Sequence, residues 1–219
     1  MMVSERSALI VVDVQLDFLP GGALPVAGGD RILAPLAALM RSGAFRDIVA
    51  TQDWHPPGHV SFASRHPPRR AFETIELYGH EQVLWPDHCV AGSHGADLHP
   101  ALPWERVRAI VRKGTDPTVD SYSAFRNNYD AHGNRPPTGL AGYLRECGVE
   151  EVYVCGLARD FCVKATALDA ADLGFGTTVL WDLTEPVAPA SDAGVRHALA
   201  SAGIAVHEAG APGSDCASG

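Results

Sequence analysis

Short runs of apolar, mostly β-branched residues recur along the chain and alternate with stretches of helical periodicity. Runs of this length that are apolar throughout are typical of strands covered on both faces, as in parallel sheets. The runs cover residues 8–14, 47–52, 107–113, 151–157, 177–182 and 203–208. This pattern predicts an α/β fold with an open, mainly parallel six-stranded sheet and helices on both faces.

Helices are predicted between or beside these strands. Each one closes at or next to a glycine, the residue preferred just after a helix. The predicted helices cover residues 30–43, 136–149, 160–174 and 189–203. Neither a repeat nor a sign of a second domain interrupts this order.

The segment 53–106 departs from the alternation, since it is rich in Pro, His and Gly and lacks any comparable periodicity. It is too long for a simple connection, and long segments of this kind usually carry function. We therefore expect a single domain over 1–209 in which 53–106 forms a functional loop region. The small, polar tail 210–219 is expected to be flexible.

Composition and charge narrow the classes of partner. The chain has 219 residues, is 46% hydrophobic and has a formal net charge of −9 without any cluster of Lys and Arg, which argues against nucleic-acid binding. A small neutral ligand fits better. No apolar stretch approaches the ~20 residues that span a bilayer, and the N-terminal residues lack the order of a signal peptide. We expect a cytoplasmic protein without membrane association, and a homo-oligomer stays an open alternative.

Side chains capable of chemistry follow the ends of four predicted strands. Asp13 ends the first strand, and Asp53 and His55 follow the second. Lys113 ends the third, and Cys162 comes shortly after the fourth. Ligands of open α/β sheets bind at the carboxyl ends of the strands, so these groups are expected to converge. Each has an ordinary explanation when taken alone, such as an edge lysine with its amine in solvent or a buried core thiol.

Of the five cysteines, Cys162 is the one whose position in the sequence suggests a chemical role. The five cysteines are odd in number and widely spaced, which predicts neither a disulfide framework nor a metal knuckle. Cys162 begins a helix, whose N–H groups favour a thiolate and can later hold an oxyanion. Cys155 lies within a strand and is expected in the core, and the other three carry no comparable signal.

Five segments together resemble the nicotinamidase branch of the isochorismatase-like cysteine hydrolases, in order and in spacing. They are VDVQLDF (12–18), TQDWHPPGHVSFA (51–63), WPDHCVAGSHGADLHP (85–100), RKGTDPTVDSYSAF (112–125) and GLARDFCV (156–163). The resemblance implies hydrolysis of nicotinamide to nicotinic acid and ammonia, with pyrazinamide as a further substrate and a role in NAD salvage. It also implies a catalytic triad of Asp13, Lys113 and Cys162.

The implied mechanism is covalent. Asp13 takes the thiol proton, the Cys162 thiolate attacks the carboxamide carbon, and backbone N–H groups of Ala158 and Cys162 hold the oxyanion. A thioester remains after ammonia leaves, and water then releases the acid. Lys113 stabilises the anionic charges. Relatives also carry a cis peptide bond that corresponds here to the one between Leu157 and Ala158.

The resemblance further implies a divalent metal held by Asp53, His55 and His88, which makes 53–106 the metal-binding loop region. Asp53 and His55 are two residues apart, which places them on one face of an extended segment, and three protein ligands leave room for substrate or water. One carboxylate and two imidazoles suit zinc, iron or manganese, and zinc is favoured. His59 is either a group behind the ligands or a loop histidine. A histidine-rich loop without metal is the alternative.

In the family the metal is thought to position the pyridine ring, directly or through water. Phe18 and Trp85 are expected to flank that ring, as their counterparts do in relatives, with Tyr122 as a weaker candidate. The alternative is that these are simple core aromatics. Arg159 departs from the small or polar residue that many relatives carry, so loop contacts or substrate preference could differ here.

Three functions from different classes stay open. The first is a cysteine amidase acting on nicotinamide or another small amide. The second is a hydrolase in which a metal-bound water attacks and Cys162 is structural. The third is a non-catalytic protein that senses metal or oxidant through Cys162. Metal-free relatives of the fold act on other amides or on vinyl ethers. The three predicted metal ligands disfavour a metal-free amidase. The presence of Cys162 disfavours an ether hydrolase, since those enzymes typically lack the cysteine.

Overall fold

The computed structural model describes residues 3–208, and its centre is a sheet of six strands. The order across the sheet is β5-β2-β1-β6-β7-β8, and every neighbouring pair is parallel. The strands are β1 (Ser7–Val12), β2 (Asp47–Asp53), β5 (Ala109–Lys113), β6 (Glu151–Leu157), β7 (Gly176–Glu185) and β8 (Ala205–His207). Each corresponds to a predicted run, so the predicted sheet is confirmed. The tail predicted for 210–219 lies outside the described residues.

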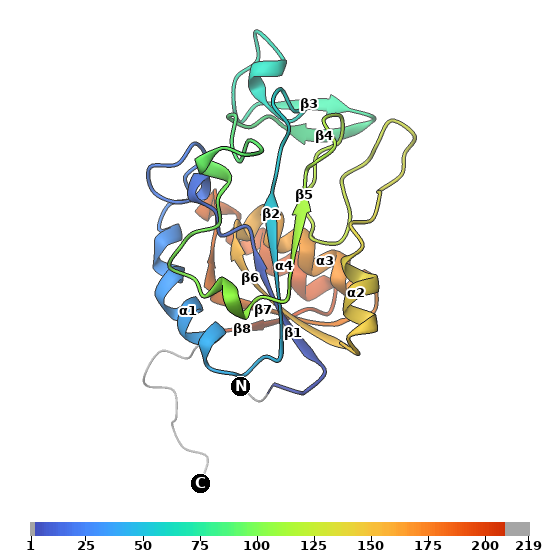
Figure 1. Ribbon diagram of the computed structural model, residues 1–219. Coiled ribbons are helices and arrows are strands. Elements are labelled where there is room, and N and C mark those ends of the chain that lie inside the picture. Colours follow the sequence, from blue (N-terminus) through green and yellow to red (C-terminus); the bar gives the residue numbers. More distant parts are fainter. Residues whose placement is uncertain (1–2, 209–219) are drawn as a thin grey trace.

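Helices cover both faces of this sheet (Figure 1). They are α1 (Leu33–Arg41), α2 (Leu140–Glu146), α3 (Lys164–Asp172) and α4 (Asp192–Ser201). The α1 helix packs on the face that receives Leu9 of β1, whereas α2, α3 and α4 pack on the face that receives Ile10. Successive side chains of a strand point to opposite faces, which is why β1 is buried throughout and is apolar at nearly every position.

One predicted helix is much shorter than its sequence periodicity indicated. The helix predicted over 136–149 begins only at Leu140. Pro137 forms a β-bridge instead, and Gly139 takes a left-handed conformation with φ of 95° just before the helix. A proline without an N–H and a glycine with positive φ therefore move the start of the helix forward.

The other three helices start with a tighter or wider turn. The helix predicted over 160–174 opens as a π-helical turn, Arg159–Val163, and continues as α3. The one predicted over 30–43 opens as a 3₁₀ turn, Gly29–Ile32, and continues as α1. The one predicted over 189–203 opens as a 3₁₀ turn, Pro189–Ser191, and continues as α4. Single π-helical turns occur often at functional sites, and this one contains Cys162.

The segment 53–106 contains an antiparallel hairpin that the sequence did not predict. Its strands are β3 (Thr74–Leu77) and β4 (His80–Val83). The turn residues Tyr78 and Gly79 have φ of 54° and 80°, and positive φ at both positions suits a tight hairpin turn. Most strand side chains are exposed or half-buried. β3 alternates polar and apolar residues over only four positions and β4 does not alternate, so the pattern is too short to predict a strand. Gln82 of β4 is buried.

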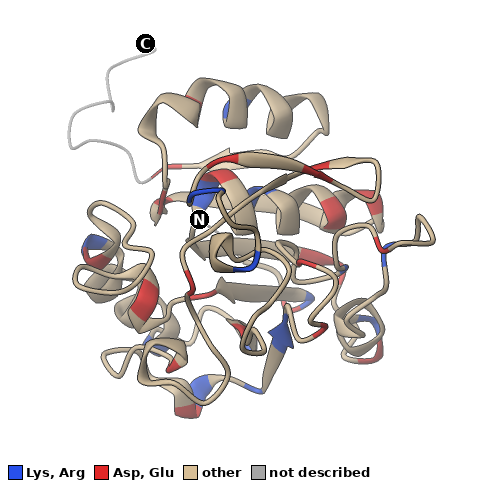
Figure 2. Cartoon of the chain, turned by 90° about the horizontal axis from the view of Figure 1, so that it is seen from above, with Lys and Arg blue, Asp and Glu red and all other residues tan. Residues whose placement is uncertain are grey.

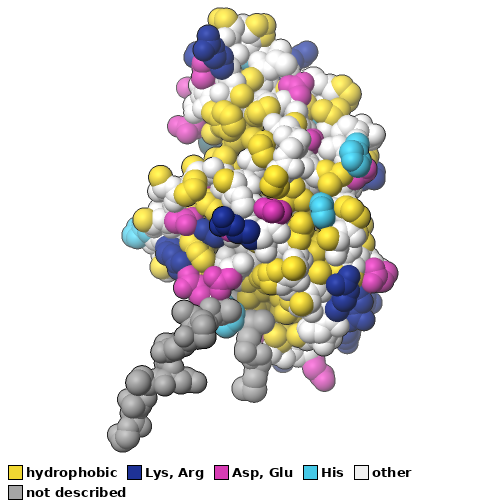
Figure 3. Space-filling view, turned by 90° about the vertical axis from the view of Figure 1, so that its left-hand side faces the viewer, with side chains coloured by type: hydrophobic (Ala, Val, Ile, Leu, Met, Phe, Trp, Pro, Cys, Tyr) yellow, Lys and Arg dark blue, Asp and Glu magenta, His cyan; other side chains and the backbone are white. Residues whose placement is uncertain are grey.

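No helix among the described residues is long and apolar enough to cross a membrane. Lys and Arg are scattered over the elements in Figure 2, and Figure 3 shows basic and acidic side chains mixed on one face. That face therefore offers a polyanion no continuous basic surface.

Gly156 of β6 lies against the backbone of β1, with φ of 107°. A Cβ at this position would meet the Val12 carbonyl oxygen at 2.1 Å, so Gly156→Ala must separate or distort the two central strands. We expect the free energy of unfolding to fall by about 3 kcal/mol in urea denaturation. Gly142→Ala in α2 is the matched control, because nothing lies within 4 Å of its Cβ. Equal stability of wild type and Gly156→Ala would contradict the close approach.

Candidate active site

The carboxyl ends of four neighbouring strands bring the predicted groups together. Asp13 follows β1, and Asp53 ends β2. Lys113 ends β5, and Cys162 lies in the π-helical turn after β6. The register of the sheet pairs Asp53 directly with Lys113. All four side chains are buried, and Lys113 is only 1% exposed, which excludes an edge lysine with its amine in solvent.

The Lys113 ammonium is the centre of this group. Its Nζ lies 2.8 Å from Asp13 Oδ2 and donates a hydrogen bond to Asp53 Oδ1. It also donates to the Ser121 carbonyl oxygen at 3.1 Å and to Cys162 Sγ at 3.4 Å. Burial alone would lower the pKa of Lys113, but the two carboxylates outweigh it and raise that pKa well above its usual value. One buried cation thus contacts both carboxylates and the thiol.

The two carboxylate oxygens of Asp13 have different partners. Thr51 donates to Oδ1 at 2.6 Å, whereas Oδ2 forms an ion pair with the Lys113 ammonium at 2.8 Å and has no further partner among the described residues. Burial raises the pKa of Asp13 to about 6, against the opposing effect of Lys113. A carboxyl group with this pKa can both take and return a proton near neutral pH.

The Cys162 thiol lies beside these carboxylates. Its sulfur and one oxygen each of Asp13 and Asp53 are all within 4.8 Å of one another. Burial raises the pKa of the thiol well above its usual value, although Lys113 opposes the effect. Burial thus outweighs the thiolate-favouring effect expected of the helix N–H groups. The thiol needs a base, and the Asp13 carboxylate is in reach.

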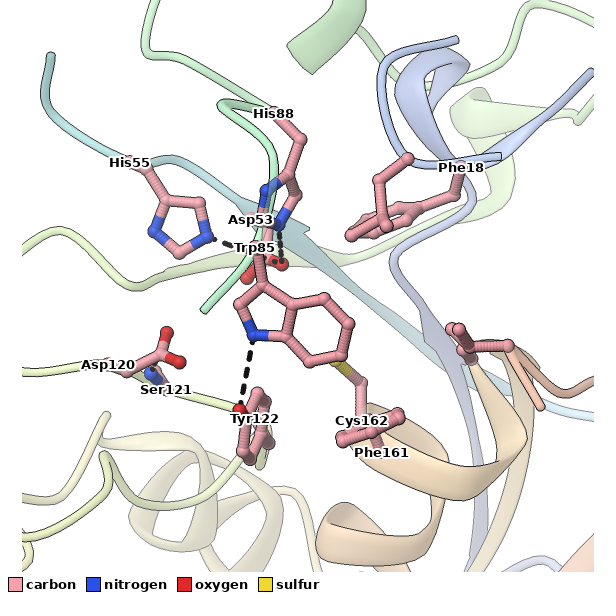
Figure 4. Close-up of a pocket in the computed structure, with 13 residues that line it drawn as sticks. Phe18, Asp53, His55, Trp85, His88, Asp120, Ser121, Tyr122, Phe161 and Cys162 are labelled. Carbon is pink, nitrogen blue, oxygen red and sulfur yellow. Dashed lines mark hydrogen bonds and ion pairs between the residues drawn. The ribbon is translucent and has the colours of Figure 1, made fainter. Parts of the chain in front are cut away.

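Asp53, His55 and His88 form a second cluster next to the first (Figure 4). His55 Nε2 lies 3.6 Å and His88 Nε2 lies 3.9 Å from Asp53 Oδ2. His55 Nδ1 is 3.1 Å from the Gly114 carbonyl oxygen, and His88 Nδ1 is 2.8 Å from that of Pro86. A carbonyl oxygen only accepts, so each Nδ1 carries the proton and each Nε2 presents a lone pair toward Asp53. These three donors fit a divalent metal ion.

The charge states of this cluster bear on metal binding. Burial, reinforced by His55, lowers the pKa of His88 to about 4 and keeps that ring neutral. Burial opposes ionisation of Asp53, but Lys113 outweighs it and lowers the pKa of Asp53 below its usual value. Burial would likewise lower the pKa of His55, but Asp53 raises it overall, so proton and metal compete for this ring. Neutral imidazole and ionised carboxylate are the forms that bind a metal.

His59 packs against the ring of His55, with ring centroids 4.4 Å apart. Its Nδ1 lies 2.8 Å from Ser61 Oγ, and its Nε2 lies 3.2 Å from the Val119 carbonyl oxygen. Both ring nitrogens are therefore bonded to protein groups, and His59 supports a ligand instead of acting as one. His55, His59 and Asp120 also bring ligand atoms within 4.8 Å, but the bonded nitrogens make this the poorer combination.

An aromatic pocket adjoins both clusters, and both expected wall residues, Phe18 and Trp85, line it (Figure 4). The Trp85 Nε1 donates to the Tyr122 hydroxyl at 3.2 Å, and its ring meets that of Phe161 edge-on with centroids 4.7 Å apart. Phe161 and Val187 also line the pocket and were not predicted. Phe161 directly precedes the candidate nucleophile, which was a usable signal, whereas Val187 belongs to none of the recognised segments.

Arg159 is not among the residues that line this pocket. Its guanidinium bonds with Thr184 and Asp192 instead. The arginine that departs from the family pattern at this position therefore makes no contact with the pocket. The peptide bond between Leu157 and Ala158 is cis, as predicted, and Ala158 lines the pocket.

Comparison with known proteins agrees with this geometry. The isochorismatase domain family matches residues 7–207. The chain belongs to this family. A nicotinamidase of Acinetobacter baylyi is 48% identical over 187 residues, which cover 85% of each chain. The nicotinamidase of Escherichia coli is 45% identical over 80% of this chain and 81% of its own.

Solved structures of isochorismatase-family relatives extend the match to nearly the whole fold. A nicotinamidase and pyrazinamidase of Acinetobacter baumanii has a TM-score of 0.88 and 45% identity, and the match covers 94% of this chain and 97% of that one. The yeast nicotinamidase bound to the inhibitor nicotinaldehyde has a TM-score of 0.85 and 34% identity, with coverage of 92% and 99%. The pyrazinamidase of Pyrococcus horikoshii in complex with zinc has a TM-score of 0.74 and 38% identity, with coverage of 93% and 99%.

Gly114 lies so close to His55 that the His55 ring can occupy its position only because residue 114 has no side chain. A Cβ there would lie 2.4 Å from His55 Cε1 and 2.5 Å from Nδ1, so Gly114→Ala must displace the ring. We expect about 10- to 100-fold weaker zinc binding, measured by titration against a competing chelator. Gly133→Ala is the matched control, because its φ is also positive but nothing lies within 4 Å of its Cβ. Unchanged zinc affinity in Gly114→Ala would argue against His55 as a ligand.

Proposed function

We propose that this chain is a nicotinamidase, which hydrolyses nicotinamide to nicotinic acid and ammonia and also accepts pyrazinamide. The observation that carries the proposal is the buried cluster of Asp13, Lys113 and Cys162, which lies beside three potential metal ligands and an aromatic pocket. The relatives named nicotinamidase, at 48% and 45% identity, and the yeast structure with nicotinaldehyde support this substrate class. The product would enter NAD salvage.

Asp13 and Cys162 perform the first chemical step. The Asp13 carboxylate takes the thiol proton, and Sγ forms a bond to the carboxamide carbon while the carbonyl electrons move to oxygen. Lys113 compensates the negative charge, since it contacts both groups. The backbone N–H groups of Ala158 and Cys162 hold the resulting oxyanion.

In the second half of the reaction, Asp13 gives up a proton twice, first to the leaving nitrogen and then to the sulfur. Asp13 gives its proton to the amide nitrogen, the C–N bond breaks, and ammonia leaves a thioester on Cys162. Asp13, ionised again, takes a proton from the water whose oxygen attacks the thioester carbon. The C–S bond then breaks, nicotinic acid is released, and the sulfur regains its proton from Asp13. A pKa of about 6 suits a carboxyl group that alternates between these roles.

Asp53, His55 and His88 would hold a divalent metal. We favour zinc over iron and manganese, because the donors are one carboxylate and two imidazoles and the Pyrococcus horikoshii relative is in complex with zinc. When bound, the metal supplies a Lewis-acidic position for the pyridine nitrogen, directly or through water. Phe18 and Trp85 flank the ring and orient the carboxamide toward the thiol.

The cellular setting and the domain organisation belong to the same proposal. The enzyme would act in the cytoplasm, because its chemistry needs a reduced thiol and the cysteines of the described residues are free. Residues 1–209 would form one catalytic domain, in which 53–106 provides metal ligands and part of the pocket wall.

Cys162→Ala tests the nucleophile. We expect ammonia release from nicotinamide to fall by about 10³-fold or more in the zinc-loaded protein, because no thioester can form. Cys147→Ala is the matched control, since Cys147 is also a free thiol but does not line the pocket. Chelated wild type is expected to lose activity and to regain it when zinc is restored.

The outcomes of this assay separate the alternatives. A Cys162→Ala protein that keeps its activity with metal would overturn the thiol mechanism and favour attack by metal-activated water. A wild type that releases no ammonia from nicotinamide or pyrazinamide after zinc is restored would overturn the proposed function.

Asp13→Asn tests the proton carrier. Asn keeps the shape of the side chain and can accept the hydrogen bond from Thr51, but it cannot take a proton. We expect kcat to fall by about 10²- to 10⁴-fold, because no carboxylate is left at this position to take the thiol proton. Asp116→Asn, at an exposed aspartate outside the pocket, is the control. Normal turnover in Asp13→Asn would assign the base elsewhere.

A further inference from the structure

Arg159 lies between the two residues whose N–H groups would hold the oxyanion, yet its side chain takes no part in the pocket. The residue is 6% exposed, and each of its three guanidinium nitrogens donates to a protein acceptor. Nε donates to Thr184 Oγ1 at 2.8 Å, and Nη1 donates to the two carboxylate oxygens of Asp192 at 2.9 and 2.8 Å. Nη2 donates to the carbonyl oxygens of Thr184 and Trp181.

These acceptors come from two elements that frame the π-helical turn. Trp181 and Thr184 belong to β7, which pairs with β6, and Asp192 is the first residue of α4. The Arg159 guanidinium also lies over the Trp181 ring, 4.1 Å from its centroid. One side chain therefore joins the turn to the neighbouring strand and to the following helix.

The next residue along the chain makes a second tie. Asp160 accepts hydrogen bonds from the N–H groups of Val187 and Ala188, both at 2.9 Å, and from the Ser191 hydroxyl at 3.2 Å. Together with Arg159, it fastens the π-helical turn to the segment between β7 and α4. Because Val187 lines the pocket, the turn and one pocket wall are held in a common frame.

We propose that Arg159 is a positioning residue for the oxyanion-binding N–H groups of Ala158 and Cys162. The inference rests on the proposed function, because the oxyanion exists only during the reaction. The Asp192 side chain is 36% exposed, and an ion pair with a solvent-exposed partner adds little net stability, so a geometric role accounts for this pair better. N–H groups displaced by about 1 Å lose much of their stabilisation of the transition state, whereas the proposed ring contacts, Phe18 and Trp85, lie on other segments that Arg159 does not contact. Loss of Arg159 is therefore expected to lower kcat and to leave KM unchanged.

The experiment compares Arg159→Met with Arg196→Met in the zinc-loaded enzyme. Met fills much of the same space but donates no hydrogen bond. Arg196 is the matched control, because its guanidinium also lies over Trp181, at 3.7 Å, but forms its ion pair with Glu208, away from the turn. For Arg159→Met we expect kcat for nicotinamide to fall by about 10- to 100-fold with KM changed by less than about twofold. For Arg196→Met we expect wild-type kcat and KM.

Two inhibitors provide a readout that a purely structural role would not move. Nicotinaldehyde can add the Cys162 thiol: Asp13 takes the proton, Sγ bonds to the aldehyde carbon, and the carbonyl electrons move to the oxygen, which then occupies the oxyanion site. Nicotinate undergoes no such addition and reports ground-state binding. Arg159→Met is expected to weaken inhibition by nicotinaldehyde about as much as it lowers kcat, and to leave inhibition by nicotinate unchanged.

Asp192→Asn is the second variant, because it removes the acceptor's charge and keeps its shape; it should give the same pattern to a smaller degree. If Arg159→Met does not fold, Asp192→Asn decides alone. Wild-type kcat and nicotinaldehyde inhibition in the variants would overturn the positioning role, and so would parallel losses in kcat, KM and nicotinate binding. A wild type without nicotinamidase activity would instead overturn the proposed function.

Discussion

The buried ammonium of Lys113 is the interaction on which the site depends. It is fully enclosed and contacts the carboxylates of Asp13 and Asp53. Each uncompensated buried charge costs several kcal/mol, so the two carboxylates cannot both stay ionised here without a cation. The same cation lowers the pKa of both carboxyl groups, and their other neighbours separate their roles: His55 and His88 lower the pKa of Asp53 further, whereas the charge of Asp53 raises that of Asp13. The pKa of Asp53 is held low, as a metal ligand requires, while burial raises the pKa of Asp13 to about 6, as a proton carrier requires.

The parallel sheet supplies the positional accuracy that this charge arrangement needs. Lys113 and Asp53 are partners in the register of β5 and β2. Gln15, just beyond β1, donates to the Asp53 carbonyl oxygen at 2.8 Å and accepts from the Asp53 N–H at 2.7 Å. These groups sit on or next to strands, so backbone hydrogen bonds fix their positions. Cys162 lies on a turn instead, so side-chain hydrogen bonds, in place of strand pairing, hold the turn in position.

The segment 53–106 completes the site, because bridges within this segment hold two of its loops beside this edge of the sheet. His55 forms a β-bridge with Val90, and Phe62 forms one with Trp85. The first bridge brings the loop with the third potential metal ligand close to the other two, and the second places a wall of the pocket. A path held by isolated bridges needs no repeating pattern of apolar residues, so periodicity could not identify it.

The sequence by itself determined the sheet and the chemistry at its edge. Apolar runs identify strands covered on both faces, and the side chains at the ends of parallel strands must converge. The family resemblance added His88 and the pocket aromatics. Only the tertiary structure decided the wall residue Val187 and the protonation of the site, because both depend on contacts between segments far apart in the chain. Burial raises the pKa of Asp13 and of the Cys162 thiol, and the contact with Lys113 opposes both, and no local pattern of residues encodes burial depth or the distance between charges.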